Sequence, residues 1–485
     1  MRITIILLFS LISQLSFAIP NSELFNYAWD DYSAYRLNLK PTQWPILNKL
    51  TDATIYRLEF DIKDTTNIKV KSEILITNQE NISLKELYFH LYPNLLGGEM
   101  IIDSVQINDQ AAEYYYENLN TTLAVVLAKE LKPTDKVLLK INYSLNVPLD
   151  FDRNYGLFTY LSSVLSLGHA YPILAVYDAN GWHTETPPEY GDLLYADSSF
   201  FQIRIIAPKG LVIVSSGKEI SSFSKANQQI IEIAAGPVRD LFISASYDFK
   251  FLEASYKGST IKSYYLATDL SSLEPNTKII AQKILDIAIS GLRIFEEKIG
   301  DYPYSELDYV PIDTSALGIE FPGIIAMTQK FYAGNNSYLE STTIHELAHQ
   351  WYYGVVGNDQ LNEPWLDEAM AQYSTLMYFG QKYGPSGYGN FRKGLVSRWN
   401  GENLVIGKSV ADYSSNEYLS VVYGLGPLVI EKLAKKMGSI SFGKFLKDYY
   451  KESKFGIGSS QSFLNIAEKS CQCKLQNFFD EWILP

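Results

Sequence analysis

The sequence predicts an α+β multidomain protein, with an N-terminal β domain followed by a mainly helical domain. Between about residue 50 and residue 250, apolar residues alternate with polar residues, and this period of two is typical of strands buried on one face. After about residue 270 the apolar period changes to 3.6, which is typical of amphipathic helices. A chain of 485 residues also exceeds what one hydrophobic core usually serves, so we expect at least two domains.

The first 18 residues are expected to be a signal peptide. Arg2 precedes an apolar run from Ile3 to Ile12, and the small residues Ser16 and Ala18 form a cleavage signature. A retained membrane anchor is the alternative, but the run is shorter than the roughly 20 residues that a membrane-spanning helix needs. We therefore expect a secreted or periplasmic protein with no transmembrane segment after the signal is removed.

Residues 19–250 are expected to form the N-terminal β domain. The alternation is clearest at 56–62 and 137–147, and both stretches are predicted to be half-buried antiparallel strands. A polar, aromatic loop at 178–192 interrupts the strands, and loops of this composition often carry binding residues. We favour a structural role for this loop, in which its aromatic side chains hold it in place.

Residues 251–485 are expected to form the mainly helical domain. Apolar residues from Ile280 to Ile294 mark one face of a helix that begins near Pro275 and ends at Gly300. Two stretches that follow resemble strands, at 307–311 and 317–327. Further helices are expected at 427–437, 442–450, 462–469 and 475–483.

The strongest chemical signal is His345-Glu346-x-x-His349. Residues four apart lie on one face of a helix, so His345 and His349 can present two imidazole nitrogens to one metal ion. Glu346 would then stand beside the open coordination position. A histidine on a helix face is more often a hydrogen-bonded core residue, but with five histidines in 485 residues this motif rarely arises by chance.

A catalytic zinc usually takes three protein ligands and keeps its fourth position for water, so one ligand is missing from the motif. Glu368, 19 residues after His349, is the candidate. Pro364 suits the first turn of a second helix, and a carboxylate one turn further would face the two histidines. We therefore predict one Zn²⁺ per chain, bound by His345, His349 and Glu368.

This donor set predicts hydrolysis of peptide bonds. Zinc bound by two imidazoles and one carboxylate lowers the pKa of its water and polarises a carbonyl group. Glu346 can then act as general base toward the zinc-activated water and carry the proton to the leaving amine.

Composition excludes other classes of function. The net charge of −13 argues against a general nucleic-acid binder, so peptide substrates and no nucleic acid are expected as partners. The two cysteines, Cys471 and Cys473, are too few for a disulfide scaffold or a cysteine-built zinc site. The sequence makes no prediction of oligomeric state.

The extended metal motif resembles the signature of the gluzincin metallopeptidases of the aminopeptidase N family. The matching residues are His345, Glu346 and His349, followed after 18 residues by Glu368 within the segment 365–369. The resemblance covers nearly the whole mature chain. It implies an antiparallel β-sandwich or saddle domain ahead of a thermolysin-like zincin catalytic domain. Larger members continue into a helical C-terminal domain, so this chain resembles a short form with a more open cleft.

The same resemblance implies three further site residues. Tyr423 matches the family tyrosine that donates a hydrogen bond to the oxyanion. Glu320, with Gly318 in the segment 318–323, is similar to the family's element that binds the free α-amino group of the substrate. A carboxylate at this position pairs with an ammonium group and restricts cleavage to the first residue. The resemblance therefore implies an aminopeptidase that releases N-terminal amino acids.

Two alternatives stay open. Ile319 and Phe321 stand where the family has methionine and asparagine, so an endopeptidase with the same zinc chemistry and an open cleft is the nearest alternative. A secreted binding protein with a peptidase fold that has lost its catalytic activity is the alternative from another class, although all four motif residues are present.

Overall fold

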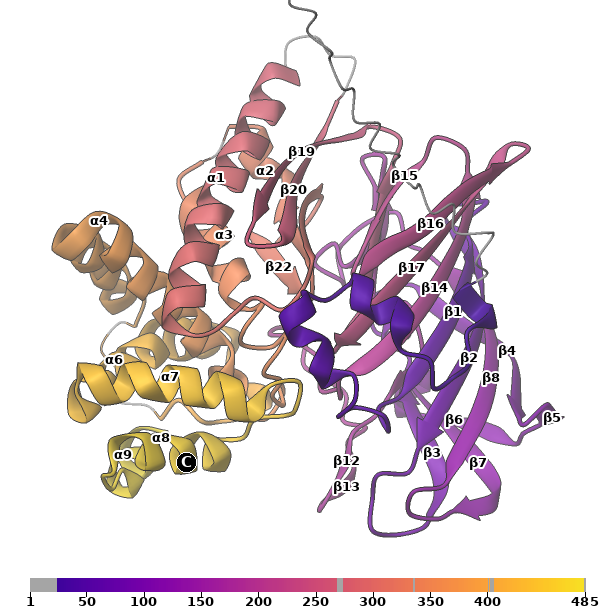
Figure 1. The fold of residues 1–485 in the computed structure, drawn as a ribbon, viewed down its shortest axis with the longest axis horizontal. Helices are drawn as coiled ribbons and strands as arrows, with labels where there is room; N and C mark the ends of the chain where they lie inside the picture. Colours follow the sequence, from indigo (N-terminus) through magenta and orange to yellow (C-terminus); the bar gives the residue numbers. More distant parts are fainter. Residues whose placement is uncertain (1–23, 268–273, 335, 400, 402–404, 484–485) are drawn as a thin grey trace, which may run out of the picture.

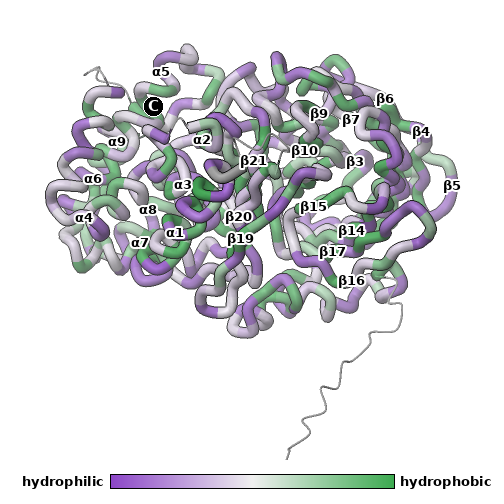
Figure 2. The backbone as a smooth tube through the Cα atoms, turned by 90° about the horizontal axis from the view of Figure 1, so that it is seen from above, coloured by the Kyte–Doolittle hydropathy of each residue, from purple (hydrophilic) through white to green (hydrophobic). Residues whose placement is uncertain are grey.

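The computed structural model describes residues 24–267, 274–334, 336–399, 401 and 405–483 (Figure 1). Most of its strands form one half of the molecule and most of its helices form the other, as the sequence predicts. Seen from above, the helices α4 to α9 lie at one end and the eight-stranded sheet lies at the opposite end (Figure 2). The expected signal peptide lies outside the described residues. Within the described ranges, none of the helices combines the length and the apolar character needed to cross a membrane.

An eight-stranded sheet forms the bulk of the N-terminal half, in the order β16-β17-β14-β1-β2-β8-β4-β5. Its strands are β1 (Ile55–Asp61), β2 (Asn67–Thr77), β4 (Glu99–Ile107), β5 (Gln110–Ala111), β8 (Lys136–Asn146), β14 (Ser199–Pro208), β16 (Lys218–Lys225) and β17 (Gln228–Val238). The burial of β8 alternates along the strand, which confirms the prediction for residues 137–147.

One strand pair corrects the prediction of purely antiparallel pairing. β1 runs parallel to β14, with Ile55 opposite Phe200 and Asp61 opposite Ile206. A parallel pair needs a long crossover connection, and here twelve intervening strands supply it. β1 is also buried on both faces over most of its length, as expected for a strand in the centre of a sheet.

Three smaller sheets complete the N-terminal half. They consist of β15 (Val212–Ser215), β18 (Phe242–Ser246), β10 (Val164–Gly168) and β9 (Phe158–Leu161); of β11 (Ile173–Leu174), β3 (Leu84–His90), β7 (Thr122–Leu131) and β6 (Tyr114–Glu117); and of β12 (Tyr177–Asp178) with β13 (Gly181–Trp182). Short 3₁₀ helices precede β1 at Leu24–Asn26, Ser33–Leu37 and Pro41–Ile46.

The C-terminal half begins with a five-stranded sheet in the order β19-β20-β21-β23-β22. The strands are β19 (Phe249–Tyr256), β20 (Ser259–Leu266), β21 (Glu306–Ile312), β22 (Gly318–Phe321) and β23 (Ile324–Thr328). The helices are α1 (Glu274–Lys298), α2 (Gln329–Tyr332), α3 (Leu339–Ala348), α4 (Glu368–Trp399), α5 (Ser415–Ser420), α6 (Gly426–Met437), α7 (Ser439–Ser453), α8 (Ser460–Cys471) and α9 (Gln476–Trp482). These bounds confirm the predicted helices and the predicted strand at 307–311, and they divide the stretch 317–327 into the two antiparallel strands β22 and β23.

A buried arginine joins the two halves next to the metal motif. Arg239 donates hydrogen bonds to the carbonyl oxygens of Ala196 (2.5 Å), Tyr353 (2.9 Å) and Gly456 (2.9 Å). Its side chain is almost completely buried, and bonds from a charged donor are strong there. Arg239 therefore fixes the β half against the segment that follows the motif helix.

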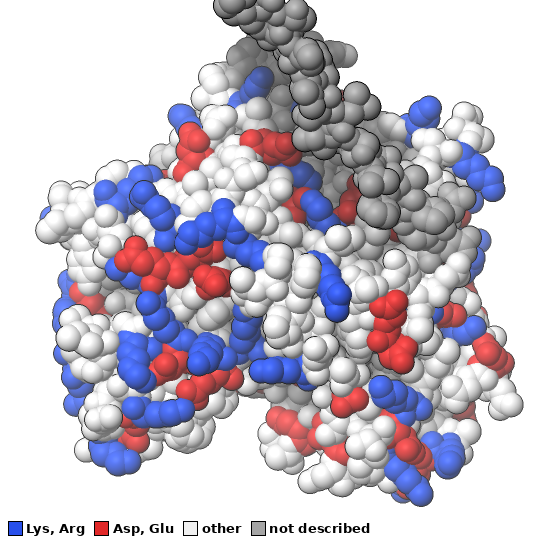
Figure 3. All heavy atoms as spheres, in the orientation of Figure 1, with Lys and Arg blue, Asp and Glu red and all other residues white. Residues whose placement is uncertain are grey.

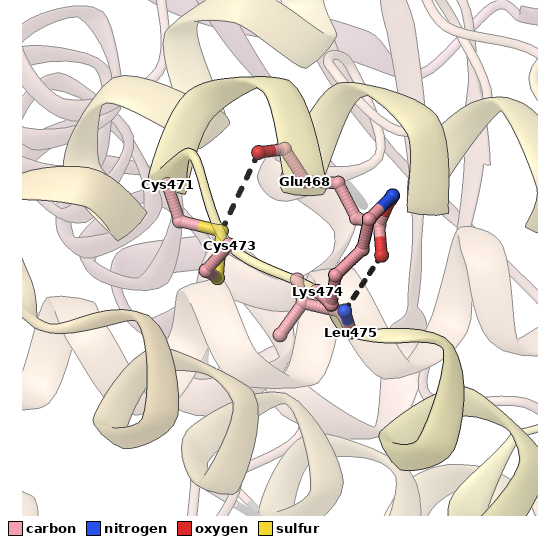
Figure 4. The surroundings of a disulfide bond; sticks show 5 residues. All are labelled: Glu468, Cys471, Cys473, Lys474 and Leu475. Atoms are coloured by element: carbon pink, nitrogen blue, oxygen red, sulfur yellow. Dashed lines mark hydrogen bonds and ion pairs between the residues drawn. A yellow bond between two sulfur atoms is a disulfide. The ribbon is translucent and has the colours of Figure 1, made fainter.

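The two cysteines form a disulfide at the C-terminal end of α8 (Figure 4). Beside it, the carboxylate of Glu468 accepts a hydrogen bond from the backbone amide of Leu475 at 2.7 Å. On the face drawn in Figure 3, Lys and Arg side chains are interspersed with Asp and Glu side chains.

Candidate active site

The two histidines of the motif lie at the C-terminal end of α3. His345 is in the last turn of the helix and His349 caps it, so that their Nε2 atoms are 3.3 Å apart. Both rings are largely buried. The helical spacing thus brings together the two nitrogens that the sequence predicts as metal ligands.

Glu368 completes a three-atom donor set at the first residue of α4. Its Oε2 lies 3.1 Å from His345 Nε2 and 3.5 Å from His349 Nε2. Zinc with bonds of about 2.0 to 2.1 Å to three corners of a tetrahedron requires these donors to be about 3.3 Å apart. The three measured separations bracket this value. Glu368 Oε2 is also buried without a hydrogen-bond partner in the described residues, as a free metal donor would be.

Neighbouring groups orient these donors. His349 Nδ1 lies 3.1 Å from the carbonyl oxygen of Tyr352, which can accept its proton and leave Nε2 as a lone-pair donor. Asp367 Oδ1 accepts a hydrogen bond from the backbone amide of Glu368 at 2.8 Å, and its Oδ2 accepts one from Gln360 at 2.8 Å. The three residues therefore fit zinc in their donor atoms, and hydrogen bonds to neighbouring groups hold two of them in position.

Glu346 lies beside the donor set, against strand β22. Its carboxylate, that of Glu320 and the His349 ring have ligand atoms within 4.8 Å of one another. Burial raises the pKa of the Glu346 carboxyl well above its usual range, and the charge of Glu320 acts in the same direction. A carboxylate with a raised pKa holds a proton more firmly, which suits a general base.

Gly318 and Glu320 reach the site from edge strand β22. Gln350 ties this strand to the end of the motif, since it donates to the carbonyl oxygen of Phe321 (3.0 Å) and accepts from the amide of Gly323 (2.9 Å). A Cβ atom at Gly318 would lie 2.5 Å from Cγ of Glu346, so the close packing here requires glycine.

Tyr423 lies in a π-helical turn, Val421–Leu425, between α5 and α6. Such turns are rare and frequently occur at functional sites. The Tyr423 hydroxyl donates a hydrogen bond to Oε1 of Glu368 at 2.5 Å. Burial and then the charge of Glu368 raise the pKa of Tyr423 well above its usual value, so the hydroxyl keeps its proton and can act as a donor.

All seven site residues that the sequence predicts except His349 line one cleft of about 1620 Å³ between the two halves. His349 lies directly beneath it, in contact with His345 and Glu368. The structure also corrects the interpretation of loop 178–192 as purely structural. The end of this loop, at Tyr190, Gly191 and Asp192, lines the same cleft, whereas His183 pairs with Asp178 and Glu185 away from it.

Comparison with known proteins gives one family match. Residues 284–482 match the sequence profile described as "Peptidase family M1 domain". The chain is 23% identical to Aminopeptidase 2 of Candida albicans over 280 residues, which is 54% of this chain and 30% of that protein. It is 28% identical to Aminopeptidase B of Mus musculus over 232 residues, which is 42% of this chain and 36% of that protein. The chain thus spans about a third of the length of these curated relatives.

Solved structures share the fold of nearly the whole chain. The crystal structure of an M1 zinc metallopeptidase from Deinococcus radiodurans superposes with a TM-score of 0.67 at 17% identity. The match covers 90% of this chain and 95% of that one. A mutant of the same enzyme, bound to a Tyr-Ser-Ala substrate, superposes with a TM-score of 0.66. The arrangement of a β half ahead of a helical half is therefore the one found in those structures.

Proposed function

Because residues 284–482 match the peptidase family M1 domain, we propose that this chain is a zinc-dependent aminopeptidase that releases N-terminal amino acids from peptides. The observation that carries the proposal is the meeting of three donor atoms, from His345, His349 and Glu368, at distances that suit zinc. Glu346 and Glu320 stand beside this donor set in a cleft open to substrate.

Zinc held by His345, His349 and Glu368 would polarise the scissile carbonyl group and make water acidic enough to react near neutral pH. The Glu346 carboxylate takes the proton from the attacking water and delivers it to the nitrogen of the leaving amine. The Tyr423 hydroxyl donates a hydrogen bond to the former carbonyl oxygen, where negative charge develops.

Glu320 selects for the N-terminus. Its side chain is 7% exposed and lines the cleft within 4.8 Å of both Glu346 and His349. A buried carboxylate favours a group that can pair with its charge, and the α-ammonium of a peptide is such a group. A substrate without this ammonium would leave the charge unpaired, and the enzyme would reject it.

The first prediction tests this selection. Replacing Glu320 by Gln is expected to lower kcat/KM for leucine p-nitroanilide about tenfold to a hundredfold, because one charge-assisted hydrogen bond is lost. The wild-type chain should cleave the N-acetylated anilide at least about a hundredfold more slowly, since acetylation removes the positive charge. Initial rates for both substrates check these expectations. Equal rates on the free and acetylated compounds would instead favour the endopeptidase.

A second prediction concerns the packing of the general base. Replacing Gly318 by Ala is expected to lower kcat about a hundredfold, because the new methyl group displaces the Glu346 side chain by about an ångström. Zinc content should not change, since Gly318 touches none of the three donors. Gly389→Ala is the matched control, because a Cβ atom there meets nothing within 4 Å. If both alanine variants keep wild-type turnover, the packing of Glu346 against Gly318 does not matter for catalysis.

A further inference from the structure

One basic side chain lines the cleft, and the proposed mechanism assigns it no role. Arg398 is the single Lys or Arg among the described residues that line the cleft, whose other charged groups include the carboxylates of Glu320 and Glu346. Arg398 is exposed, and it forms no ion pair with an acid in the described part of the chain. Its guanidinium group is therefore available to a negatively charged group of a ligand.

A reversal within α4 brings the C-terminal end of this helix back to the metal site. The helical backbone breaks at Gly384, where φ is +67° and ψ is −160°. The part after the break packs against the part before it. The rings of Phe379 and Phe391 are stacked with their centroids 4.9 Å apart, and Leu376 shares a small buried cluster with Leu395. The last turn of α4 therefore lies level with its first turns, whereas a straight helix would place it about 45 Å away.

The end of α4 packs against the π-helical turn that carries Tyr423. Ser420 donates a hydrogen bond to the carbonyl oxygen of Trp399 at 3.2 Å. A Cβ atom at Gly424 would lie 2.8 Å from the amide nitrogen of Trp399 and 3.2 Å from the carbonyl carbon of Arg398. This close approach of two backbones requires glycine. The backbone of Arg398 is therefore held beside Tyr423.

Glu320 lies on the His349 side of the zinc donors, and Arg398 lies on the His345 side. Ligand atoms of Glu320 and His349 are within 4.8 Å of each other. The ring of Tyr423 lies against His345, with centroids 5.9 Å apart. Burial lowers the pKa of His345, and the positive charge of Arg398 acts in the same direction, so this ring is within its electrostatic reach. A peptide with its ammonium at Glu320 and its scissile carbonyl at the metal site would extend its leaving side, the part after the scissile bond, toward Arg398.

A buried polar atom near this path has no protein partner. Gln372 lies on α4 one turn after Glu368, lines the cleft and is 8% exposed. Its Oε1 has no hydrogen-bond partner among the described residues. Such atoms are rare in folded proteins, and one at the wall of a cleft can accept a hydrogen bond from a backbone amide of a bound peptide. Because α4 folds back on itself, Gln372 and Arg398 lie at about the same level of the helical hairpin.

We propose that Arg398 binds a carboxylate on the leaving side of the substrate. This carboxylate is the C-terminal group of a short peptide or an acidic side chain close behind the scissile bond. The planar guanidinium matches a carboxylate from either source with two parallel hydrogen bonds. The proposal rests on the aminopeptidase function above and adds a substrate class to it, namely peptides that carry a negative charge shortly after the bond that is cleaved.

Phosphinic analogues of short peptides test this proposal without turnover, because a PO₂–CH₂ unit replaces their scissile amide. The first pair is the analogue of Leu-Gly-Gly and its C-terminal amide, which differ in the α-carboxylate. The second pair is the C-terminal amides of the Leu-Asp-Gly and Leu-Asn-Gly analogues, which differ in the side chain. Calorimetry on the zinc-loaded wild-type chain is expected to show about threefold to tenfold tighter binding of the carboxylate member of at least one pair. Arg398→Gln should remove this preference.

Three comparisons separate binding by Arg398 from a structural role. Arg398→Lys keeps the charge without the planar fork and should retain part of the preference. Added salt should weaken the preference of the wild-type chain, because exposed charges are screened. Lys393→Gln is the matched control, since it removes one exposed positive charge from the same part of α4 and Lys393 does not line the cleft.

The proposal is overturned if the wild-type chain shows no preference within either pair, or if Arg398→Gln keeps the preference of the Lys393→Gln control. Equal weakening of all four analogues by Arg398→Gln would also overturn it, because a purely structural role predicts that result. Wild-type hydrolysis of leucine p-nitroanilide, measured in parallel, reports separately on the proposed function. That substrate has no carboxylate on its leaving side, so Arg398→Gln should change its kcat/KM by less than about twofold.

Discussion

Replacing Glu346 by Gln is expected to lower kcat for leucine p-nitroanilide about 10²-fold to 10⁴-fold, the range that a general base contributes. Glutamine keeps the size of the side chain and its packing against Gly318 but cannot accept the proton of the attacking water. KM should change little, because Glu346 acts on the transition state more than on the bound substrate.

Measurements of zinc content and of KM distinguish the loss of the general base from damage to the whole site. The Glu346→Gln variant should retain one zinc per chain, since none of the three donor atoms is changed. Glu297→Gln, on the exposed face of α1, is the matched control and should keep wild-type kcat. Undiminished hydrolysis by a Glu346→Gln protein that holds zinc would remove Glu346 from the mechanism.

Removal of zinc is expected to have the second large effect, on activity and on stability together. Without the cation, the buried carboxylates of Glu320, Glu346 and Glu368 repel one another and Glu368 Oε2 loses its partner. At a free zinc concentration of about a thousand times Kd, binding stabilises the folded chain by about 4 kcal/mol. Chelation with dipicolinate should therefore abolish hydrolysis and lower Tm by about 5 °C or more.

A variant that lacks one zinc donor provides the control for chelation. Glu368→Gln should bind zinc poorly from the start, and its Tm should be insensitive to dipicolinate. A wild-type Tm and rate that both survive complete removal of metal would show that the three donors have another role.

The site residues that the sequence predicts most accurately are those whose relative positions follow from local backbone geometry. His345 and His349 meet because helical residues four apart share a face, and Glu346 follows from the same helix. Glu368 reaches the two histidines only through a turn and a second helix. Its spacing from His349 and the proline before it nevertheless predict this position. The alternation in β8 likewise reflects a local rule, since successive side chains of a strand point to opposite faces.

The features that the sequence did not predict depend on contacts between distant segments. The parallel pairing of β1 with β14 joins strands that are far apart in the chain, and no local pattern specifies it. The position of Asp192 at the cleft depends on bonds from its loop to Tyr413, Tyr92 and Gln360, which only the folded chain brings together. The composition of loop 178–192 suggested a binding loop but could not show which of its residues face the site.

The most direct test of a zinc-dependent aminopeptidase is a zinc titration of the metal-free protein, followed by the initial rate on leucine p-nitroanilide. We expect no hydrolysis at the start, a linear rise of the rate with added zinc, and a plateau at one zinc per chain. At every point the N-acetylated anilide should be cleaved at least about a hundredfold more slowly than the free amine. Hydrolysis by the metal-free protein, or no hydrolysis after one equivalent of zinc is bound, would show that the chain is not a zinc-dependent aminopeptidase.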